Sequence, residues 1–346
     1  MKKVVIIGHF AKKQNFLDGQ TIKTIIFTEE LERFFGKDNV ERINTFCWKK
    51  NPFKLFLKSI LAVLNCKNVL FFTDQGGIKV FPWLLTISNI FGKCKIHYVV
   101  IGGWLPEFMK KHGILRFFTK KLDYIYVETS TMKKSLDEQG FGNVYIVPNC
   151  KELDILERQE LVYNECEPFR LCTFSRVMRE KGIEDAAKAV TKINEKYGKI
   201  IYTLDIYGQV DPEQTEWFEE LKKNFPEYIQ YKGCAPFDKS VEILKNYFAL
   251  LFPTYYESEG FAGTLLDAFA SGLPVIASNW KYNSEIVKEG TTGTLYNLEE
   301  DDGLFEKLNY LYKNTDVREK MRINCLQEAE KYTPKNVISR IISKIN

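Results

Sequence analysis

Short apolar runs alternate along this chain with longer stretches whose apolar residues recur at helical spacing. In the first half the runs occupy residues 4–8, 69–73, 96–101, 124–128 and 144–147, and in the second half residues 169–175, 202–208, 229–233, 248–254, 274–278 and 294–297. Strands that are buried on both faces are apolar almost throughout, and strands that alternate with helices form parallel sheets. The pattern therefore predicts an α/β protein with two doubly wound, Rossmann-like parallel sheets.

A polar, acidic segment between residues 151 and 167 separates the two series of strands. It indicates a join after Val147-Pro148-Asn149-Cys150, with a first domain over residues 1–152 and a second over residues 168–332. The last segment, 333–346, has its apolar residues on one helical face, which predicts a helix that packs back on the first domain. Ligands of such sheets bind beyond the carboxyl ends of the strands, so we expect functional residues just after strands, around a cleft between the domains.

Charge is divided unevenly between the two halves. Residues 1–150 carry a net charge of +11 and the remainder −7, within a total of +4 over 346 residues. A basic half is typical of proteins that meet nucleic acid, an anionic membrane surface or a phosphorylated substrate. No recognised nucleic-acid-binding module accompanies this charge, so nucleic acid is not an expected partner.

The apolar runs are all shorter than the ~20 residues that a membrane-spanning helix needs. The run after Met1-Lys2-Lys3 fits a first strand better than a signal peptide, so we expect a cytosolic protein. The eight cysteines are scattered without a C-x-x-C pair, and the three histidines do not join cysteines or carboxylates at metal-ligand spacing. We therefore expect reduced thiols, no metal and no cofactor.

Candidate chemistry is concentrated between residues 253 and 278, which read as strand, polar loop, glycine-flanked turn, helix and strand. Gly260 and Gly263 let the backbone approach a ligand closely, and amides at the helix start near Thr264 favour an anion such as a diphosphate. Glu259 lies in the loop and Asp267 about one turn inside the helix. Both carboxylates can accept hydrogen bonds from ligand hydroxyls.

A second candidate segment, residues 174–182, follows the first strand of the second domain. Its cations Arg176 and Lys181 would lie beyond the carboxyl end of that strand. Two fixed cations there can stabilise negative charge on a ligand. Taken alone, the two side chains would serve equally well as solvated loop charges.

Together, and in this order, the two segments resemble the retaining glycosyltransferases of family 4, which have the GT-B fold. Residues 259–267 resemble the family's E-x7-E motif with Asp267 in the second position, and residues 174–182 resemble its G-R-L-x-x-x-K-G segment. The resemblance implies three catalytic residues, Glu259 toward the donor sugar and Arg176 and Lys181 on the diphosphate. It also implies that Asp267 contacts the ribose. Matching motifs occur through most of residues 170–330, whereas residues 1–150 resemble the family only in their predicted architecture.

Weaker matches extend the donor-binding set. Gly208 ends a strand at a glycine turn of the family, Gly233 lies in a loop that resembles the one around the base, and Asp18-Gly19-Gln20 occupies the position of a glycine loop that faces the leaving group. The donor-binding residues implied by the resemblance are Asp267, Gly260, Phe261, Ala262, Gly263, Thr264, Leu265, Gly208, Gly233 and Gly19.

The first half would hold the acceptor. Gly102 and Gly103 end a strand where many members of the family carry a histidine, which this chain lacks. They are the acceptor-side candidates. His9 also ends a strand, and a buried, hydrogen-bonded structural histidine is the interpretation we favour for it.

Basic amphipathic stretches at residues 52–61 and 108–121 interleave lysines with aromatic and aliphatic residues. This composition suits an anionic membrane interface, where the protein would reach a lipid-linked acceptor. Ordinary core-packing helices with solvated lysine faces explain it equally well. Both interpretations stay open at the level of sequence.

The sequence therefore predicts a metal-independent, retaining hexosyltransferase that uses a nucleotide sugar, UDP-sugars first among the candidates. Its acceptor would be a glycan, lipid-linked, in cell-surface polysaccharide synthesis. A nonhydrolysing sugar-nucleotide epimerase and a non-catalytic nucleotide-sugar-binding protein are the alternatives. The segment from Glu259 to Asp267 and the lack of an acid–base set argue against the epimerase. No G-x-G-x-x-G follows a strand, which disfavours an NAD oxidoreductase.

Overall fold

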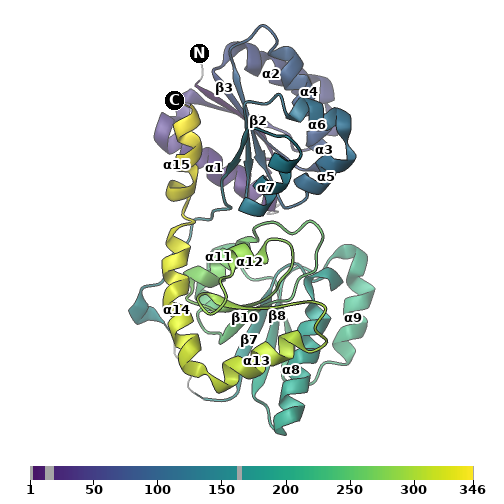
Figure 1. Cartoon of the computed structure of the whole chain (residues 1–346), viewed down its shortest axis with the longest axis vertical. Coiled ribbons are helices and arrows are strands. Elements are labelled where there is room, and N and C mark those ends of the chain that lie inside the picture. The colour runs from purple at the N-terminus through teal and green to yellow at the C-terminus, as the bar shows by residue number, and fades with distance from the viewer. Residues whose placement is uncertain (1–2, 12–18, 162–165, 346) are drawn as a thin grey trace. The chain divides into compact units, whose positions relative to one another are not determined.

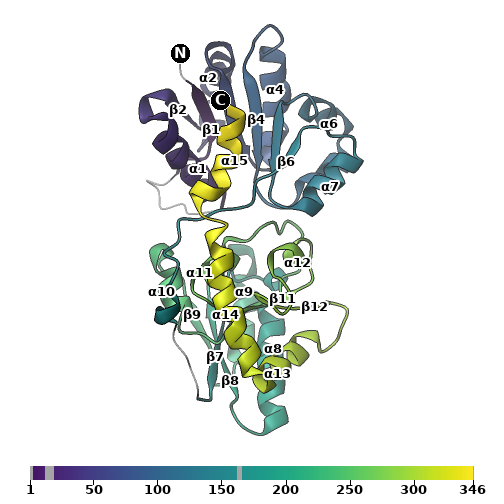
Figure 2. The same cartoon turned by 60° about the vertical axis from the view of Figure 1, so that its left-hand side comes forward.

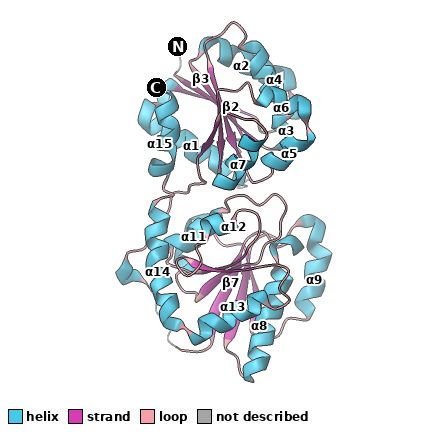
Figure 3. Ribbon diagram, viewed as in Figure 1, coloured by secondary structure: helices cyan, strands magenta, loops and turns pink. Residues whose placement is uncertain are grey.

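The computed structural model describes residues 3–11, 19–161 and 166–345, and the chain divides into two α/β units (Figure 1). The first unit comprises Met1–Glu152 and Tyr332–Asn346, and the second comprises Leu153–Lys331. Each unit contains a six-stranded sheet whose neighbouring strands are parallel, with helices packed on its faces (Figure 3). The predicted pair of doubly wound parallel sheets is thereby confirmed.

The first sheet has the strand order β2-β1-β3-β4-β5-β6. Its strands are β1 (Val4–Gly8), β2 (Val40–Asn44), β3 (Asn68–Thr73), β4 (Lys95–Val100), β5 (Tyr124–Val127) and β6 (Val144–Ile146). Its helices are α1 (Gly19–Phe35), α2 (Pro52–Asn65), α3 (Gln75–Ile78), α4 (Phe81–Ser88), α5 (Leu105–Lys111), α6 (Gly113–Thr119), α7 (Ser130–Glu138) and α15 (Pro334–Ile345).

Strand β2 has no counterpart among the apolar runs of the sequence. Only Val40 and Ile43 are buried in it, whereas Glu41, Arg42 and Asn44 are exposed. An edge strand pairs on one side only and is partly solvated, so it can carry polar residues that a central strand excludes. This is why the periodicity of the sequence missed it.

Helix α15, from the end of the chain, lies beside α1 in the first unit (Figure 2). Its apolar face consists of Val337, Ile338, Ile341, Ile342 and Ile345, which join a buried cluster with residues of β1, β3 and α1. A stripe of this kind at helical spacing needs an apolar surface to cover it, and the sheet with α1 supplies that surface.

The second sheet has the strand order β12-β11-β10-β7-β8-β9. Its strands are β7 (Phe169–Phe174), β8 (Tyr202–Tyr207), β9 (Ile229–Gly233), β10 (Ala249–Phe252), β11 (Val275–Ser278) and β12 (Gly293–Tyr296). Its helices are α8 (Ile183–Tyr197), α9 (Thr215–Lys223), α10 (Ser240–Leu244), α11 (Gly263–Ala270), α12 (Asn283–Ile286), α13 (Gly303–Lys313) and α14 (Thr315–Glu330).

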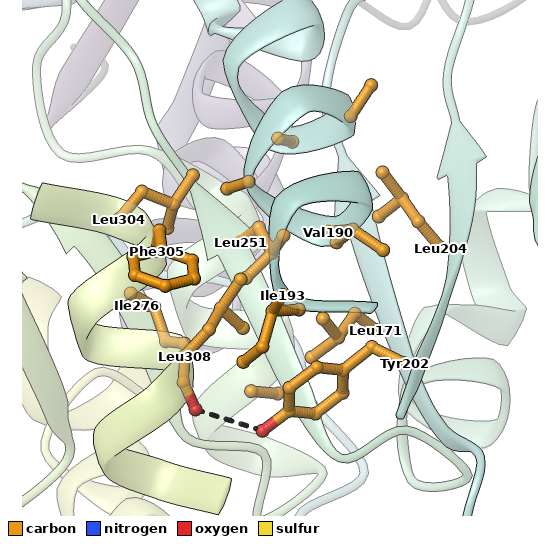
Figure 4. Close-up of a cluster of buried hydrophobic side chains, with 14 of the residues drawn as sticks. Leu171, Val190, Ile193, Tyr202, Leu204, Leu251, Ile276, Leu304, Phe305 and Leu308 are labelled. Atoms are coloured by element: carbon orange, nitrogen blue, oxygen red, sulfur yellow. Dashed lines mark hydrogen bonds between the residues drawn. The ribbon is translucent and has the colours of Figure 1, made fainter. Parts of the chain in front are cut away.

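The core of the second unit lies between this sheet and helices α8 and α13 (Figure 4). Val190 and Ile193 of α8 and Leu308 of α13 pack there against strand residues. Tyr202 is fully buried, and its hydroxyl donates a hydrogen bond of 3.1 Å to the Leu308 carbonyl. The phenol thus ties β8 to α13 without leaving a buried polar group unpaired.

His97 in the first sheet gives the stability of that unit a dependence on pH. The ring is fully buried, 2.9 Å from the Tyr126 hydroxyl and 3.2 Å from Asn68 Oδ1. Burial, helped by nearby Lys95, lowers the pKa of His97 to about 3.

The unfolded chain takes up this proton at about pH 6.5, whereas the folded chain does so only near pH 3. The contribution of His97 to the free energy of unfolding is therefore complete above about pH 6.5. It is lost at about 1.4 kcal/mol per pH unit as the pH falls toward 3. Urea unfolding of wild type and His97→Gln between pH 7 and 4 measures this. If the free energy of unfolding has the same slope against pH in both proteins, the lowered pKa of His97 is contradicted.

Candidate functional site

Lys181 and Glu259 form an ion pair at the carboxyl edge of the second sheet. Lys181 Nζ lies 2.5 Å from Glu259 Oε2, and Thr254 Oγ1 donates to the same carboxylate oxygen at 2.7 Å. The lysine and glutamate side chains are only 12% and 7% exposed. The ammonium also lies over the Tyr256 ring, 5.1 Å from its centroid. A cation and a carboxylate, 78 residues apart, are therefore held in fixed positions with little water around them.

Gly182 allows the loop after β7 to approach the end of β10. It has φ +69°, and a Cβ at this position would lie 2.2 Å from the Pro253 carbonyl oxygen. Glu180 O then accepts a hydrogen bond from Tyr255 N at 2.8 Å, and Thr254 Oγ1 lies 3.2 Å from the same oxygen. These backbone contacts bring Lys181 beside the loop that carries Glu259. Only glycine combines this φ with so close an approach.

Arg176 lies at the end of β7 but has a different carboxylate partner. Its guanidinium is 56% exposed, and Nη1 lies 3.3 Å from Asp211 Oδ2. Val177 N donates to Gln209 O at 2.9 Å, which holds the segment beside the end of β8. The structure thus joins Lys181 and Glu259 directly, whereas Arg176 stands in solvent on the same strand-end loop.

Gly208 and Gly233 lie next to one another where β8 and β9 end. Gly208 N donates to Gly233 O at 2.9 Å, and the Tyr231 hydroxyl donates to Gly208 O at the same distance. Gly208 has φ +138°, and a Cβ there would lie 1.7 Å from the Ser175 carbonyl oxygen. Because Gly208 has no side chain, the backbone segment that carries Arg176 can lie directly against it.

Helix α11 begins directly after the loop of Glu259. Gly263, Thr264 and Leu265 form its first turn, which follows Ala262 at the N-cap, and Gly260 and Phe261 before it are buried. Thr264 Oγ1 is buried and has no hydrogen-bond partner among the described residues. A buried hydroxyl without a hydrogen-bond partner is energetically costly, so a ligand oxygen at this turn would supply the missing partner.

Asp267 lies one turn further along α11 and is buried, with 3% of its surface exposed. The Ser240 hydroxyl of α10 donates to its Oδ1 at 2.7 Å. Ser240 could not be identified from the sequence, because nothing in its local pattern marks it. Thr254, by contrast, ends an apolar run, and its position alone could have indicated a role at the site.

In the first unit, Gly19 begins α1, and Gly102 and Gly103 follow β4; Asp18 lies outside the described residues. Gly102 has φ +80°. The side chain of Lys23 in α1 is buried nearby, with Nζ 3.0 Å from the carbonyl oxygen of Val100 at the end of β4 and 2.5 Å from Glu128 Oε1. No local pattern in the sequence marks this buried ion pair.

A cavity of about 270 Å³ opens where β1, β2 and β3 end in the first unit. Thr73 lines it, is 3% exposed, and has a hydroxyl with no partner among the described residues. His9 also lines it and lies 2.5 Å from the Thr21 hydroxyl, so the ring is hydrogen-bonded and borders the cavity. The lining residues are His9, Gln20, Thr45, Cys47, Trp48, Leu55, Phe56, Thr73, Asp74, Gly76, Gly77, Val80 and Phe81.

Residues 3–11, 19–161 and 166–345 contain neither a metal-binding cluster nor a membrane-spanning helix. No three histidine, cysteine or carboxylate side chains gather there in a way that could hold a metal ion. No helix in these ranges is both long enough and apolar enough to cross a bilayer.

Each of the two units contains a six-stranded parallel sheet, and the second unit holds the buried Lys181–Glu259 pair beyond the strand ends. This architecture defines a GT-B fold. Anabaena HepE in complex with UDP superposes with a TM-score of 0.74 at 14% identity, covering 100% of this chain and 99% of that one. The pneumococcal O-GlcNAc transferase GtfA in complex with UDP and GlcNAc gives a TM-score of 0.65 at 22% identity, covering 84% of this chain and 59% of that one.

Residues 157–327, which lie in the second unit, match the family model of glycosyl transferases group 1. Among curated proteins, the GtfA subunit of a UDP-N-acetylglucosamine–peptide N-acetylglucosaminyltransferase from Streptococcus pneumoniae is 28% identical over 232 residues. That match covers 64% of this chain and 44% of the relative. The chain therefore spans less than half the length of this curated relative.

Proposed function

We propose that the chain is a retaining glycosyltransferase that moves a hexosyl group from a nucleotide sugar, with UDP-sugars first, to a glycan acceptor. The observation that carries the proposal is the Lys181–Glu259 pair beside the first turn of α11. The group 1 family match of this unit supports it, as do the UDP ligands named for GtfA and HepE. The acceptor we propose is lipid-linked and serves cell-surface polysaccharide synthesis.

In the proposed reaction the bond between the sugar C1 and the diphosphate oxygen breaks, and a bond from C1 to an acceptor hydroxyl oxygen forms on the same face. The acceptor proton passes to the leaving diphosphate. Lys181, Arg176 and the amides at the start of α11 stabilise the charge that grows on the diphosphate. Glu259 orients the donor sugar, and Asp267, with Ser240, takes the ribose. These cations and amides perform the role that a metal ion has in other transferases.

The acceptor would bind the first unit, with Gly102 and Gly103 as its candidate contacts, while Gly19 would contact the donor. The cavity beside His9 and Thr73 offers the unpartnered Thr73 hydroxyl to a polar ligand. The curated name of GtfA specifies a peptide acceptor, so a peptide is the second candidate.

A screen of nucleotide sugars for release of the nucleoside diphosphate tests the proposal. UDP-sugars should be tried first and GDP-mannose next, each without acceptor, with a lipid-linked glycan and with a peptide. We expect release that depends on the glycan acceptor, and product with the anomeric configuration of the donor. Conversion of the donor sugar without acceptor would indicate an epimerase, and binding of nucleotide with no turnover would indicate a non-catalytic protein.

Thr264 gives a prediction that separates ligand binding from folding. Thr264→Val removes a buried hydroxyl that has no protein partner, so the free chain should be as stable as wild type or slightly more stable. If the hydroxyl binds the diphosphate, the Kd for UDP should rise about tenfold, the equivalent of one hydrogen bond to a charged group. Calorimetric titration with UDP and thermal unfolding of the free protein measure the two effects.

Thr173 supplies the matched control. Its hydroxyl is also buried without a partner among the described residues, but it lies within β7 rather than at the start of α11. Thr173→Val should leave the Kd for UDP unchanged. Equal affinity of the Thr264→Val protein and wild type would remove Thr264 from the donor site.

A further inference from the structure

Helix α2 has apolar residues on two faces, and only one of them is covered. A surface helix of a globular protein ordinarily turns one apolar stripe to the core and polar residues to solvent. Here a second stripe recurs at helical spacing on the solvent side, with Phe53 84% exposed. The buried face holds Leu55, Ser59, Ala62 and Val63, and the exposed apolar face holds Phe53, Leu57, Leu61 and Leu64.

The neighbouring helices repeat this arrangement. Helix α4 packs against both α2 and α6, so the three helices form one side of the first unit (Figure 1). The turn after α4 ends in Phe91, whose side chain is fully exposed, and Ile114 at the start of α6 is 78% exposed. Together the exposed apolar residues define the α2–α4–α6 surface: Phe53, Leu57, Leu61, Leu64, Trp83, Ile87, Ile90, Phe91, Ile114 and Phe117.

Basic residues outnumber acidic ones around these apolar side chains, although Asp38 and Glu41 line a cavity together with Lys58 and Leu61 of α2. Residues 45–122 contain 13 lysines and arginines but only two acidic residues, Asp74 and Glu107. Asp74 caps α3, where its Oδ1 accepts from the amides of Gly76 and Gly77. The helices α2, α4 and α6 themselves contain no acidic residue.

The lysines next to the apolar stripes are available for an external anion. Lys54, Lys58 and Lys93 are exposed, and none of them forms an ion pair within the described part of the chain. Lys121 Nζ lies over the Phe117 ring, 4.6 Å from its centroid, so cation and aromatic ring sit together. Exposed aromatic and aliphatic residues interleaved with unpaired lysines fit the boundary between acyl chains and anionic headgroups.

We propose that the α2–α4–α6 surface docks the protein on an anionic lipid bilayer. The apolar side chains enter the interface, and the lysines bind the headgroup charges. A symmetric second copy fits the surface less well, because an isologous contact would bring two strongly basic surfaces together. The inference does not depend on the proposed transfer reaction, although docking would give the site access to a lipid-linked acceptor.

Co-sedimentation with vesicles tests the docking. We expect the full chain to bind vesicles of phosphatidylcholine mixed with phosphatidylglycerol, and to bind neutral phosphatidylcholine vesicles at least tenfold more weakly. The triple variant Lys54→Glu, Lys58→Glu, Lys93→Glu should lose about 100-fold in affinity, because each lysine near an anionic surface contributes roughly fivefold. The triple variant Phe53→Ser, Leu57→Ser, Phe91→Ser should lose at least tenfold.

Matched substitutions outside the surface provide the controls. Phe34→Ser alters an exposed phenylalanine of α1, and the pair Lys313→Glu, Lys320→Glu reverses exposed charges at the end of α13 and on α14. These variants should bind vesicles like wild type. No vesicle binding by wild type, or equal losses in the controls, would overturn the proposal. A dimer in light scattering that the Phe53, Leu57 and Phe91 substitutions dissociate would also overturn it and assign the surface to a second copy.

Donor chemistry provides a separate readout. With a water-soluble acceptor, the surface variants should release nucleoside diphosphate at the wild-type rate, which also shows that they are folded. The double variant Lys181→Met, Glu259→Gln should bind vesicles like wild type. Failure of the proposed transfer reaction would therefore leave the vesicle result intact, and failure of docking would leave the turnover result intact.

Discussion

Lys181→Met is expected to lower turnover by about 100-fold or more, because it removes a fixed cation from the position where charge grows on the leaving diphosphate. The substitution also leaves Glu259 buried without its cation, since Lys181 Nζ lies 2.5 Å from the carboxylate. Breaking a buried pair in this way costs about 3 kcal/mol of stability. Activity loss in the single variant could therefore come from misfolding alone.

The double variant Lys181→Met, Glu259→Gln separates the two causes. It removes both charges together, so stability should return to within about 1 kcal/mol of wild type, while turnover stays at least 100-fold lower. Urea unfolding and steady-state release of nucleoside diphosphate measure the two quantities. Lys188→Met on α8 is the control, because Lys188 pairs with Glu184 on the surface and should affect neither. Wild-type turnover in the stable double variant would remove Lys181 and Glu259 from the catalytic site.

The sequence predicted the two sheets because their central strands are buried on both faces. Val69 to Thr73 in β3 and Val275 to Ser278 in β11 are apolar or small at nearly every position, and the structure buries every residue of both. The edge strand β2 was missed because Glu41 and Arg42 are solvated there. Periodicity thus finds a strand only where burial forces its composition.

The candidate site could be predicted in part, for a different physical reason. Residues that follow parallel strands lie at one edge of the sheet, so segments 174–182 and 253–267 could be placed at the same edge. The pairing itself could not be read from the sequence, because it depends on how Gly182 lets Glu180 contact the backbone after Pro253. For the same reason, Arg176 and Lys181 looked equivalent, although Arg176 pairs with Asp211 in solvent.

Partners contributed by distant segments were not predictable at all. Ser240 reaches Asp267 from α10, and Lys23 reaches Glu128 across 105 residues of sequence. Such contacts are fixed by tertiary packing rather than by local spacing, and no single-sequence pattern encodes them. The exposed stripe on α2 is the opposite case. Its basic amphipathic composition was visible, but only the structure shows that Phe53 and Leu57 face solvent while Leu55 is buried.

Gly208→Ala is expected to disrupt the donor site more than Gly233→Ala does. The new Cβ would lie 1.7 Å from the Ser175 carbonyl oxygen and 3.4 Å from Arg176 N, and the backbone has φ +138°. Both neighbours are main-chain atoms, so the segment carrying Arg176 must move. Strain and overpacking of this kind cost about 3 kcal/mol. A displaced segment should also weaken UDP binding by at least tenfold.

Gly233→Ala is the matched comparison, because Gly233 is adjacent to Gly208 and also has a positive φ, +73°, but has no atom within 4 Å of its would-be Cβ. Its cost should be limited to the left-handed backbone conformation, about 1 kcal/mol. Thermal unfolding should place the Gly208→Ala protein several degrees below Gly233→Ala, and UDP titration should show the same order. Equal unfolding temperatures would mean that the Ser175–Arg176 segment yields without cost. In that case the close contact at Gly208 would not be what positions the guanidinium.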